Sequence, residues 1–185
     1  NASWKPHKLW SKTDVCTLTP DDFEAPPSVI VCFEVAEHVE PDHCRRMLAK
    51  FHEILEDDGR VFLSTPCYDA HTGAAANHVN EMTYQAFGAA LEDTGFRVEG
   101  HWGTFASMKD YKDELTPAQK EVWDELRQYY DTNYLSTILA PLVPAHSRNV
   151  LWQLTKDQSI PRLFPNLRDV EGIWGSSEEW EKLCP

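Results

Sequence analysis

The sequence predicts an α/β fold built on a doubly wound, mostly parallel sheet, and three observations lead to that prediction. The run from Val29 to Phe33 is apolar at every position, which is typical of a strand buried on both faces in a parallel sheet. Strand-like and helix-like segments alternate along residues 29–102. Prolines and glycines mark the ends of these segments, as expected where short loops connect them.

Composition narrows the class of protein. A chain of 185 residues that is 42% hydrophobic can bury one substantial core, so we expect one domain or the larger part of one. Five cysteines without a CxxC pair favour free thiols and a cytoplasmic location. A net charge of -13 makes a nucleic-acid partner less favourable than a small molecule. The apolar runs are too short to cross a bilayer, so we expect no membrane partner.

The first elements follow from local signals. Residues 14–18 are expected to form a short strand, and residues 19–23 have the composition of a turn or helix start. After the strand at residues 29–34, Pro41 is expected to begin a helix that ends at Gly59. Apolar residues recur along that helix at spacings of three and four, namely Cys44, Met47, Leu48, Phe51, Ile54 and Leu55.

The same signals continue toward the C-terminus. We expect a strand at residues 61–65, a helix at 83–94 and a strand at 96–102. Residues 116–146 interrupt the alternation and read as a helical insertion, and residues 149–155 read as the last strand. We therefore expect one domain over residues 1–156 and an aromatic C-terminal extension over residues 157–185.

The insertion contains a predicted amphipathic helix, residues 117–130, followed by a second apolar segment at 135–142. Its aromatic residues favour a lid or a dimer surface over a platform for stacking nucleotide bases, given the acidic net charge. These residues are Trp123, Tyr129, Tyr130 and Tyr134.

Glu34, Glu37 and His38 follow the apolar strand, at the edge of a parallel sheet where ligands usually bind. If a helical turn begins at Glu34, residues at i, i+3 and i+4 share one face. Two carboxylates and an imidazole suit a divalent cation, with His78 as a fourth ligand. The alternative is that Glu37 and His38 cap the next segment or pair with a basic neighbour.

Four stretches together resemble the second half of a class I S-adenosylmethionine-dependent methyltransferase, a Rossmann-like fold. They are residues 32–39, 54–66, 78–81 and 94–98. The resemblance covers residues 14–156 and implies one sheet containing residues 29–33, 61–65, 97–102 and 150–154, the last antiparallel to its neighbours. It also implies that Glu34 and Val35 line the side of the cleft that holds S-adenosylmethionine. Ser28 stands where the family usually has Asp, and Asp57–Gly59 where it usually has Pro-Gly-Gly.

The family's N-terminal strands and glycine-rich loop are missing, since none of the eight glycines forms a GxGxG motif. Because the chain begins with Asn1, we expect it to be the C-terminal part of a longer protein. On its own it is expected to bind the cofactor weakly. The sheet edge left open by the missing strands is expected to be covered by a partner chain, by a second copy in a homo-oligomer, or by residues 4–10.

Glu-x-x-Glu-His is the metal-binding arrangement of two subfamilies that this stretch resembles, the ubiquinone-biosynthesis O-methyltransferases and the small-RNA terminal ribose methyltransferases. The resemblance implies that Glu34, Glu37, His38 and His78 bind Mg²⁺, Mn²⁺, Fe²⁺ or Zn²⁺. It implies methyl transfer to a hydroxyl or another nucleophile of a small molecule, with Tyr68 lining the acceptor pocket. The alternatives are ribose 2′-O-methylation of RNA and a catalytically silent interaction subunit.

The remaining candidate residues are expected to serve the fold. Three cysteines are expected to pack in the core and three histidines to be solvated, the cysteines being Cys32, Cys44 and Cys67 and the histidines His43, His52 and His71. Glu81 is expected near the start of a helix, where the helix dipole favours a carboxylate.

Overall fold

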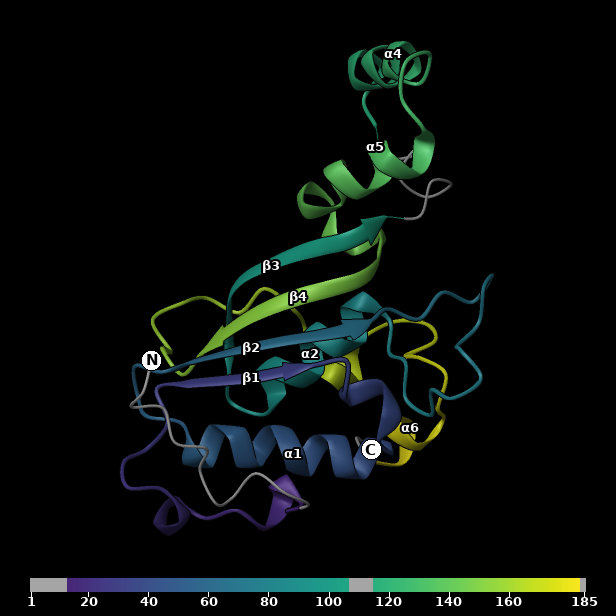
Figure 1. The fold of residues 1–185 in the computed structure, drawn as a ribbon. Coiled ribbons are helices and arrows are strands. Elements are labelled where there is room, and N and C mark those ends of the chain that lie inside the picture. Colours follow the sequence, from purple (N-terminus) through teal and green to yellow (C-terminus); the bar gives the residue numbers. More distant parts are fainter. Residues whose placement is uncertain (1–12, 107–114, 184–185) are drawn as a thin grey trace.

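The computed structural model describes residues 13–106 and 115–183, and its centre is one mixed sheet of four strands (Figure 1). The strands are β1 (Val29–Phe33), β2 (Arg60–Pro66), β3 (Arg97–Ala106) and β4 (Ser147–Thr155), in the order β1-β2-β4-β3. β1 and β2 are parallel, whereas β4 runs antiparallel to both β2 and β3. The predicted α/β, Rossmann-like fold class is confirmed, and so is the antiparallel last strand. The sheet is mixed rather than mostly parallel, because only the pair β1 and β2 is parallel.

Helices cover one face of the sheet. α1 (Pro41–Ile54) ends before the predicted boundary at residues 57–59 and buries five of the six predicted apolar positions, while the sixth, Leu55, is buried directly after it. α2 (Tyr84–Asp93) is capped by Thr83, whose side chain accepts from the Ala86 amide. The inward residues of β2 and β4 complete this core, namely Val61, Leu63, Val150, Trp152 and Leu154. Buried and half-buried residues alternate along β2, which is expected when one face of a sheet is covered more fully than the other.

β1 corrects the prediction of a strand buried on both faces. Cys32 points into the core, but Val31 on the opposite face is 59% exposed and Val29 and Phe33 are also exposed. β1 stands at the end of the strand order, and the core of the described residues lies on one face only. An unbroken apolar run therefore indicates a strand of apolar side chains, but it does not show which faces of that strand are covered by other parts of this chain.

The N-terminal segment also differs from expectation. The strand predicted at residues 14–18 is a 3₁₀ helix, Val15–Thr17, because the Asp14 carboxylate accepts from the Cys16 amide at 2.9 Å and turns the chain. A second 3₁₀ helix, Pro20–Asp22, carries the expected turn. The residues from Trp4 to Trp10, proposed to cover the sheet edge, lie outside the described residues.

The insertion forms two helices, α4 (Pro117–Leu126) and α5 (Thr132–Leu139), which stand away from α1 beyond the ends of β3 and β4 (Figure 1). They have a small core of their own around Trp123, Leu135 and Ala140. α4 ends four residues before the predicted boundary at Tyr130. Within the described ranges, no helix is long and apolar enough to cross a membrane.

The C-terminal segment packs into the main core. Phe164, Leu167 and Trp180, the last from α6 (Glu179–Leu183), are buried among residues of the sheet and helices. Phe164 stacks edge-on against Trp152 of β4, with ring centroids 5.7 Å apart. The aromatic extension is thus part of the same hydrophobic core as the sheet.

Substitution of Gly88 provides a test of how the C-terminal segment packs against α2, because a Cβ atom at this position would lie 2.6 Å from the ring of Phe164. The ring is 7% exposed and held against Trp152, so it has little room to move. We expect Gly88→Ala to lower the free energy of unfolding by about 1–3 kcal/mol, despite alanine's higher helix propensity. Urea unfolding followed by circular dichroism measures the change, with the exposed Gln85→Ala in the same helix as control. Equal stability of the two variants would contradict the packing of the extension.

Candidate functional site

The chain makes a sharp change of direction where β1 ends. Glu34 has a φ of 54°, in the left-handed region that costs a non-glycine residue about 1–2 kcal/mol. Its amide still donates to the Ser64 carbonyl at 2.9 Å, and its carboxylate accepts from the Ser64 hydroxyl at 2.6 Å and from the Asn149 amide at 2.9 Å. These bonds offset the strain and fix Glu34 over β2 and β4.

The structure corrects the predicted helical turn at Glu34. The prediction placed Glu34, Glu37 and His38 on one face of a helical turn, but the helical segment begins only at Ala36, as a 3₁₀ helix, Ala36–His38. The left-handed conformation of Glu34 therefore directs its side chain toward the neighbouring strands and away from Glu37 and His38. Glu34 is not among the three residues whose ligand atoms lie within 4.8 Å of one another, so its role as a metal ligand stays a prediction.

Glu37, His38 and His78 do converge. One potential ligand atom of each lies within 4.8 Å of the other two. Glu37 Oε1 is 3.7 Å from His38 Nε2, and the two imidazoles meet edge to face with centroids 4.7 Å apart. Two residues next to β1 and one residue 40 positions later in the chain thus form a single cluster.

Neighbouring acceptors hold both imidazoles by the same ring nitrogen. His38 Nδ1 lies 3.1 Å from the Asn77 carbonyl, and His78 Nδ1 lies 2.5 Å from Glu81 Oε1. Because both partners are acceptors, Nδ1 carries a hydrogen in each ring, and in the neutral ring the lone pair is then on Nε2. This arrangement is typical of histidines that bind a metal through Nε2.

The carboxylates of this cluster are buried. Glu37 is 1% exposed, its Oε2 accepts from Thr65 Oγ1 at 3.2 Å, and burial raises its pKa. Glu81 is also buried; its Oε1 accepts from the Ala75 amide as well as facing His78, while its Oε2 has no hydrogen-bond partner. Glu81 is therefore a partner of His78 rather than the helix-dipole residue that the sequence suggested.

A buried amide holds the two halves of the cluster together. Asn80 Nδ2 donates to the Ala36 carbonyl at 3.0 Å, and Asn80 Oδ1 accepts from Trp180 Nε1 at 2.7 Å. The amides of Val79 and Asn80 both donate to the Glu37 carbonyl. The C-terminal segment thus supports the loop that carries His78.

A cavity of about 440 Å³ opens where β2 ends. Tyr68, predicted to line an acceptor pocket, lies on its wall together with Tyr84 and Arg148. The Arg148 guanidinium is 3.6 Å from Asp69 Oδ2, too far for a hydrogen bond, so the cavity contains a weakly paired cation. Tyr68 follows Cys67, which pairs with Met82 beside Glu81, so the cavity adjoins the loop of the cluster.

The remaining predicted residues fall into two groups. Cys32, Cys44 and Cys67 are buried, and burial raises each thiol pKa to about 12, so none is an activated nucleophile. The prediction of solvated histidines is wrong for His52, which packs edge to face on Phe96 and whose pKa is lowered by burial. It is also wrong for His43, which is half-buried beside Asp14.

The residues that the sequence did not reveal are the supporting ones. Thr65, Asn77, Asn80 and Trp180 act through contacts between segments far apart in the chain. Only Glu81 had a local signal, its spacing of three residues from His78.

Comparison with known proteins identifies the family. A model of a methyltransferase domain matches residues 3–101. Among solved structures, 1,6-didemethyltoxoflavin-N1-methyltransferase of Burkholderia thailandensis shares 16% identity over 76% of this chain and 47% of its own, with a TM-score of 0.44. A TehB-like SAM-dependent methyltransferase from Corynebacterium glutamicum shares 17% over 78% and 54%, with a TM-score of 0.44.

The small RNA methyltransferase HEN1 shares 14% identity over 88% of this chain and 18% of its own, with a TM-score of 0.49. No curated protein sequence matches the chain. The chain spans about half the length of the first two methyltransferases.

Trp180 provides a test of the support behind the cluster. Trp180→Phe keeps the buried ring but leaves Asn80 Oδ1 without its donor, which we expect to lower the free energy of unfolding by about 1–3 kcal/mol. The control is Trp174→Phe, because Trp174 is only half-buried and water can replace it at the Val170 carbonyl. Denaturant unfolding of both variants measures the difference, and a loss no greater than the control's would show that the Asn80 bond is not supporting the loop.

Proposed function

Because the chain belongs to the methyltransferase domain family, we propose that it serves S-adenosylmethionine-dependent methyl transfer to a hydroxyl of a small molecule, assisted by a divalent metal ion at Glu37, His38 and His78. The observation that carries the proposal is the convergence of one potential ligand atom from each of Glu37, His38 and His78, with both imidazole rings held through Nδ1. Histidines that only cap a helix or form surface ion pairs have no need for both rings to be held through Nδ1.

The donor set favours particular ions. Two imidazole nitrogens and one carboxylate suit Mn²⁺, Fe²⁺ or Zn²⁺ better than Mg²⁺, which prefers oxygen ligands. Three protein ligands leave positions for oxygens of an acceptor. When bound, such an ion lowers the pKa of a coordinated hydroxyl and fixes its orientation. An acceptor with two neighbouring hydroxyls would use this chemistry best.

The chain's own residues have separable roles in this proposal. Glu37 supplies negative charge from a buried position, where opposite charges attract more strongly than in water. Glu81 and the Asn77 carbonyl keep the two imidazoles in the orientation that exposes Nε2. Tyr68, Tyr84 and Arg148 line the adjoining cavity, which we propose receives the acceptor.

The cofactor fits this chain only in part. Glu34 and Val35 are proposed to line its side of the cleft, but Glu34 already accepts from Ser64 and Asn149, and the sequence has no GxGxG loop. We propose that a partner polypeptide carrying such a loop covers the edge of β1 and its exposed apolar face. S-adenosylmethionine would supply the methyl group in that assembly.

Two alternatives remain distinguishable. A terminal ribose of RNA also has neighbouring hydroxyls, but a net charge of -13 opposes binding of its phosphates. Assays with a catechol and with an RNA bearing a free terminal ribose separate these acceptors. A catalytically silent subunit would methylate neither.

The four described cysteines are free, which supports a cytoplasmic location.

Metal binding provides the main test of the proposal. We expect Glu37→Gln, His38→Ala and His78→Ala each to weaken Mn²⁺ binding by about 10–100-fold, because each removes one ligand. Isothermal titration with Mn²⁺ measures this, and Mn²⁺ is chosen because thiolates bind it poorly. Glu34→Gln is the matched control and should bind normally. In a complete enzyme, His38→Ala should reduce transfer by about one to two orders of magnitude, whereas full activity in a strong chelator would refute a metal role.

Cofactor affinity tests the partner proposal separately. Because the glycine-rich loop is missing from the sequence, we expect the 185-residue chain alone to bind S-adenosylmethionine no more tightly than the high micromolar range. Titration with S-adenosylhomocysteine measures this. A low-micromolar dissociation constant for the lone chain would show that it needs no partner for the cofactor.

A further inference from the structure

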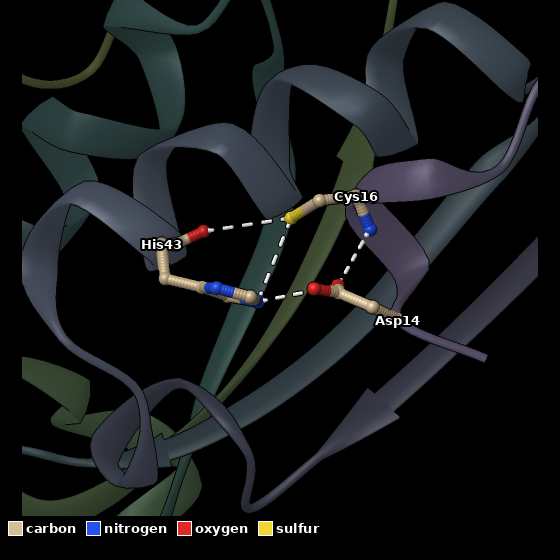
Figure 2. Close-up of side chains that lie close together, drawn as sticks. All are labelled: Asp14, Cys16 and His43. Carbon is tan, nitrogen blue, oxygen red and sulfur yellow. Dashed lines mark hydrogen bonds and ion pairs between the residues drawn. The ribbon is translucent and has the colours of Figure 1, made fainter. Parts of the chain in front are cut away.

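A second cluster of potential ligands lies on the outer side of α1, away from the proposed acceptor cavity. Asp14 and Cys16 come from the first 3₁₀ segment and His43 from the first turn of α1 (Figure 2). Cys16 Sγ is 3.5 Å from His43 Nε2, and that same nitrogen is 3.4 Å from Asp14 Oδ1. All three atoms lie within 4.8 Å of one another.

The geometry does not suit a nucleophilic cysteine. In a catalytic triad the imidazole uses one ring nitrogen for the nucleophile and the other for the carboxylate. Here both Cys16 and Asp14 face Nε2 (Figure 2). Burial also raises the pKa of Cys16, which is opposite to the change that activates a thiol.

Two of the three distances between the ligand atoms match those of a four-coordinate metal ion, and the third is within 4.8 Å. Zinc bonds of about 2.3 Å to sulfur and about 2.0–2.1 Å to nitrogen or oxygen, arranged tetrahedrally, place S and N about 3.5 Å apart and N and O about 3.4 Å apart. The observed separations are 3.5 and 3.4 Å. An ion among the three atoms would replace the contacts that Cys16 Sγ and Asp14 Oδ1 both make with the same ring nitrogen.

The charges around the cluster are compatible with a dication. A thiolate and a carboxylate together carry two negative charges, which balance one Zn²⁺. Two cations act on the cluster, Arg46 and Lys50. Arg46 bonds Asp42 at 2.9 Å and Lys50 bonds Glu53 at 2.6 Å, so each has its own carboxylate.

We propose that Asp14, Cys16 and His43 form a Zn²⁺ site that fastens the N-terminal 3₁₀ segment to α1, with water in the fourth position. The side chains of Asp14 and His43 are 47% and 30% exposed, so solvent reaches the ion. This site is independent of the proposed methyl transfer. It also differs in chemistry from the Glu37 cluster, which contains no thiolate.

Cobalt substitution tests the site directly. Titrating the full chain with Co²⁺ should produce the thiolate-to-cobalt charge-transfer absorption of a tetrahedral site, which the Glu37 cluster cannot produce because it contains no thiolate, and Zn²⁺ should abolish it. Cys16→Ser changes one atom, keeps the Asp14 cap on residue 16, and should remove the band. His43→Ala should weaken Co²⁺ binding by about 10–100-fold.

Two controls distinguish this site from other ligands. Cys184→Ser and His38→Ala should both keep the band, because neither residue is one of the three proposed ligands. Circular dichroism confirms that each variant is folded, and His43→Ala serves alone if Cys16→Ser is not. No band in the wild-type chain, or a band that survives Cys16→Ser or disappears with Cys184→Ser, would overturn the proposal.

A stability measurement gives a second readout. In the His38→Ala background, where the other cluster is disabled, Zn²⁺ should raise the melting temperature in a concentration-dependent way. Adding Cys16→Ser to that background should remove the shift. A shift of equal size in both would assign the stabilising ion to other residues and reject the site.

Discussion

The arrangement of the candidate site depends on the buried amide of Asn80. This side chain donates to the Ala36 carbonyl and accepts from Trp180 Nε1, so it joins the turn after β1, the loop that carries His78 and the C-terminal helix. Its own backbone amide and that of Val79 bind the Glu37 carbonyl. Leaving a buried amide without one of its hydrogen-bond partners destabilises the folded protein. The three segments therefore hold one another in place.

Backbone conformation at Glu34 decides which carboxylate joins the cluster. With φ at 54°, the chain turns abruptly after β1, and Glu34 faces Ser64 and Asn149 while Glu37 enters the space beside Thr65. One strained residue thus gives two nearby carboxylates different surroundings. Glu34 is bound to polar groups of β2 and β4, and Glu37 is buried next to two imidazoles. Strain of this kind persists only where surrounding bonds compensate for it.

The sequence predicted what depends on local periodicity and failed where distant segments meet. The spacing of Cys44, Met47 and Phe51 was sufficient to locate α1, and the apolar runs located the four strands of the sheet, although the strand predicted at residues 14–18 is a 3₁₀ helix. The exposed face of β1 was missed because an apolar run does not say which neighbours are present. Trp180 and Asn80 are 100 residues apart, and no local pattern predicts that bond. A positive φ at Glu34 was equally unpredictable, because glutamate has no preference for that region.

His38 and His43, one from each proposed metal site, lie on either side of Pro41 in the sequence. The donor atoms of the two sites differ, and this difference suits them to different roles. His38 belongs to a set of two nitrogens and an oxygen, whereas His43 belongs to a set that includes a thiolate. Nitrogen and oxygen donors leave an ion able to bind further oxygens of an acceptor, which the proposed reaction requires. A thiolate favours zinc and lowers the ion's remaining positive charge, which suits a structural tie between the N-terminal segment and α1. Since α1 begins at Pro41, between these histidines, an ion at His43 would also limit movement of the helix that follows the Glu37 cluster.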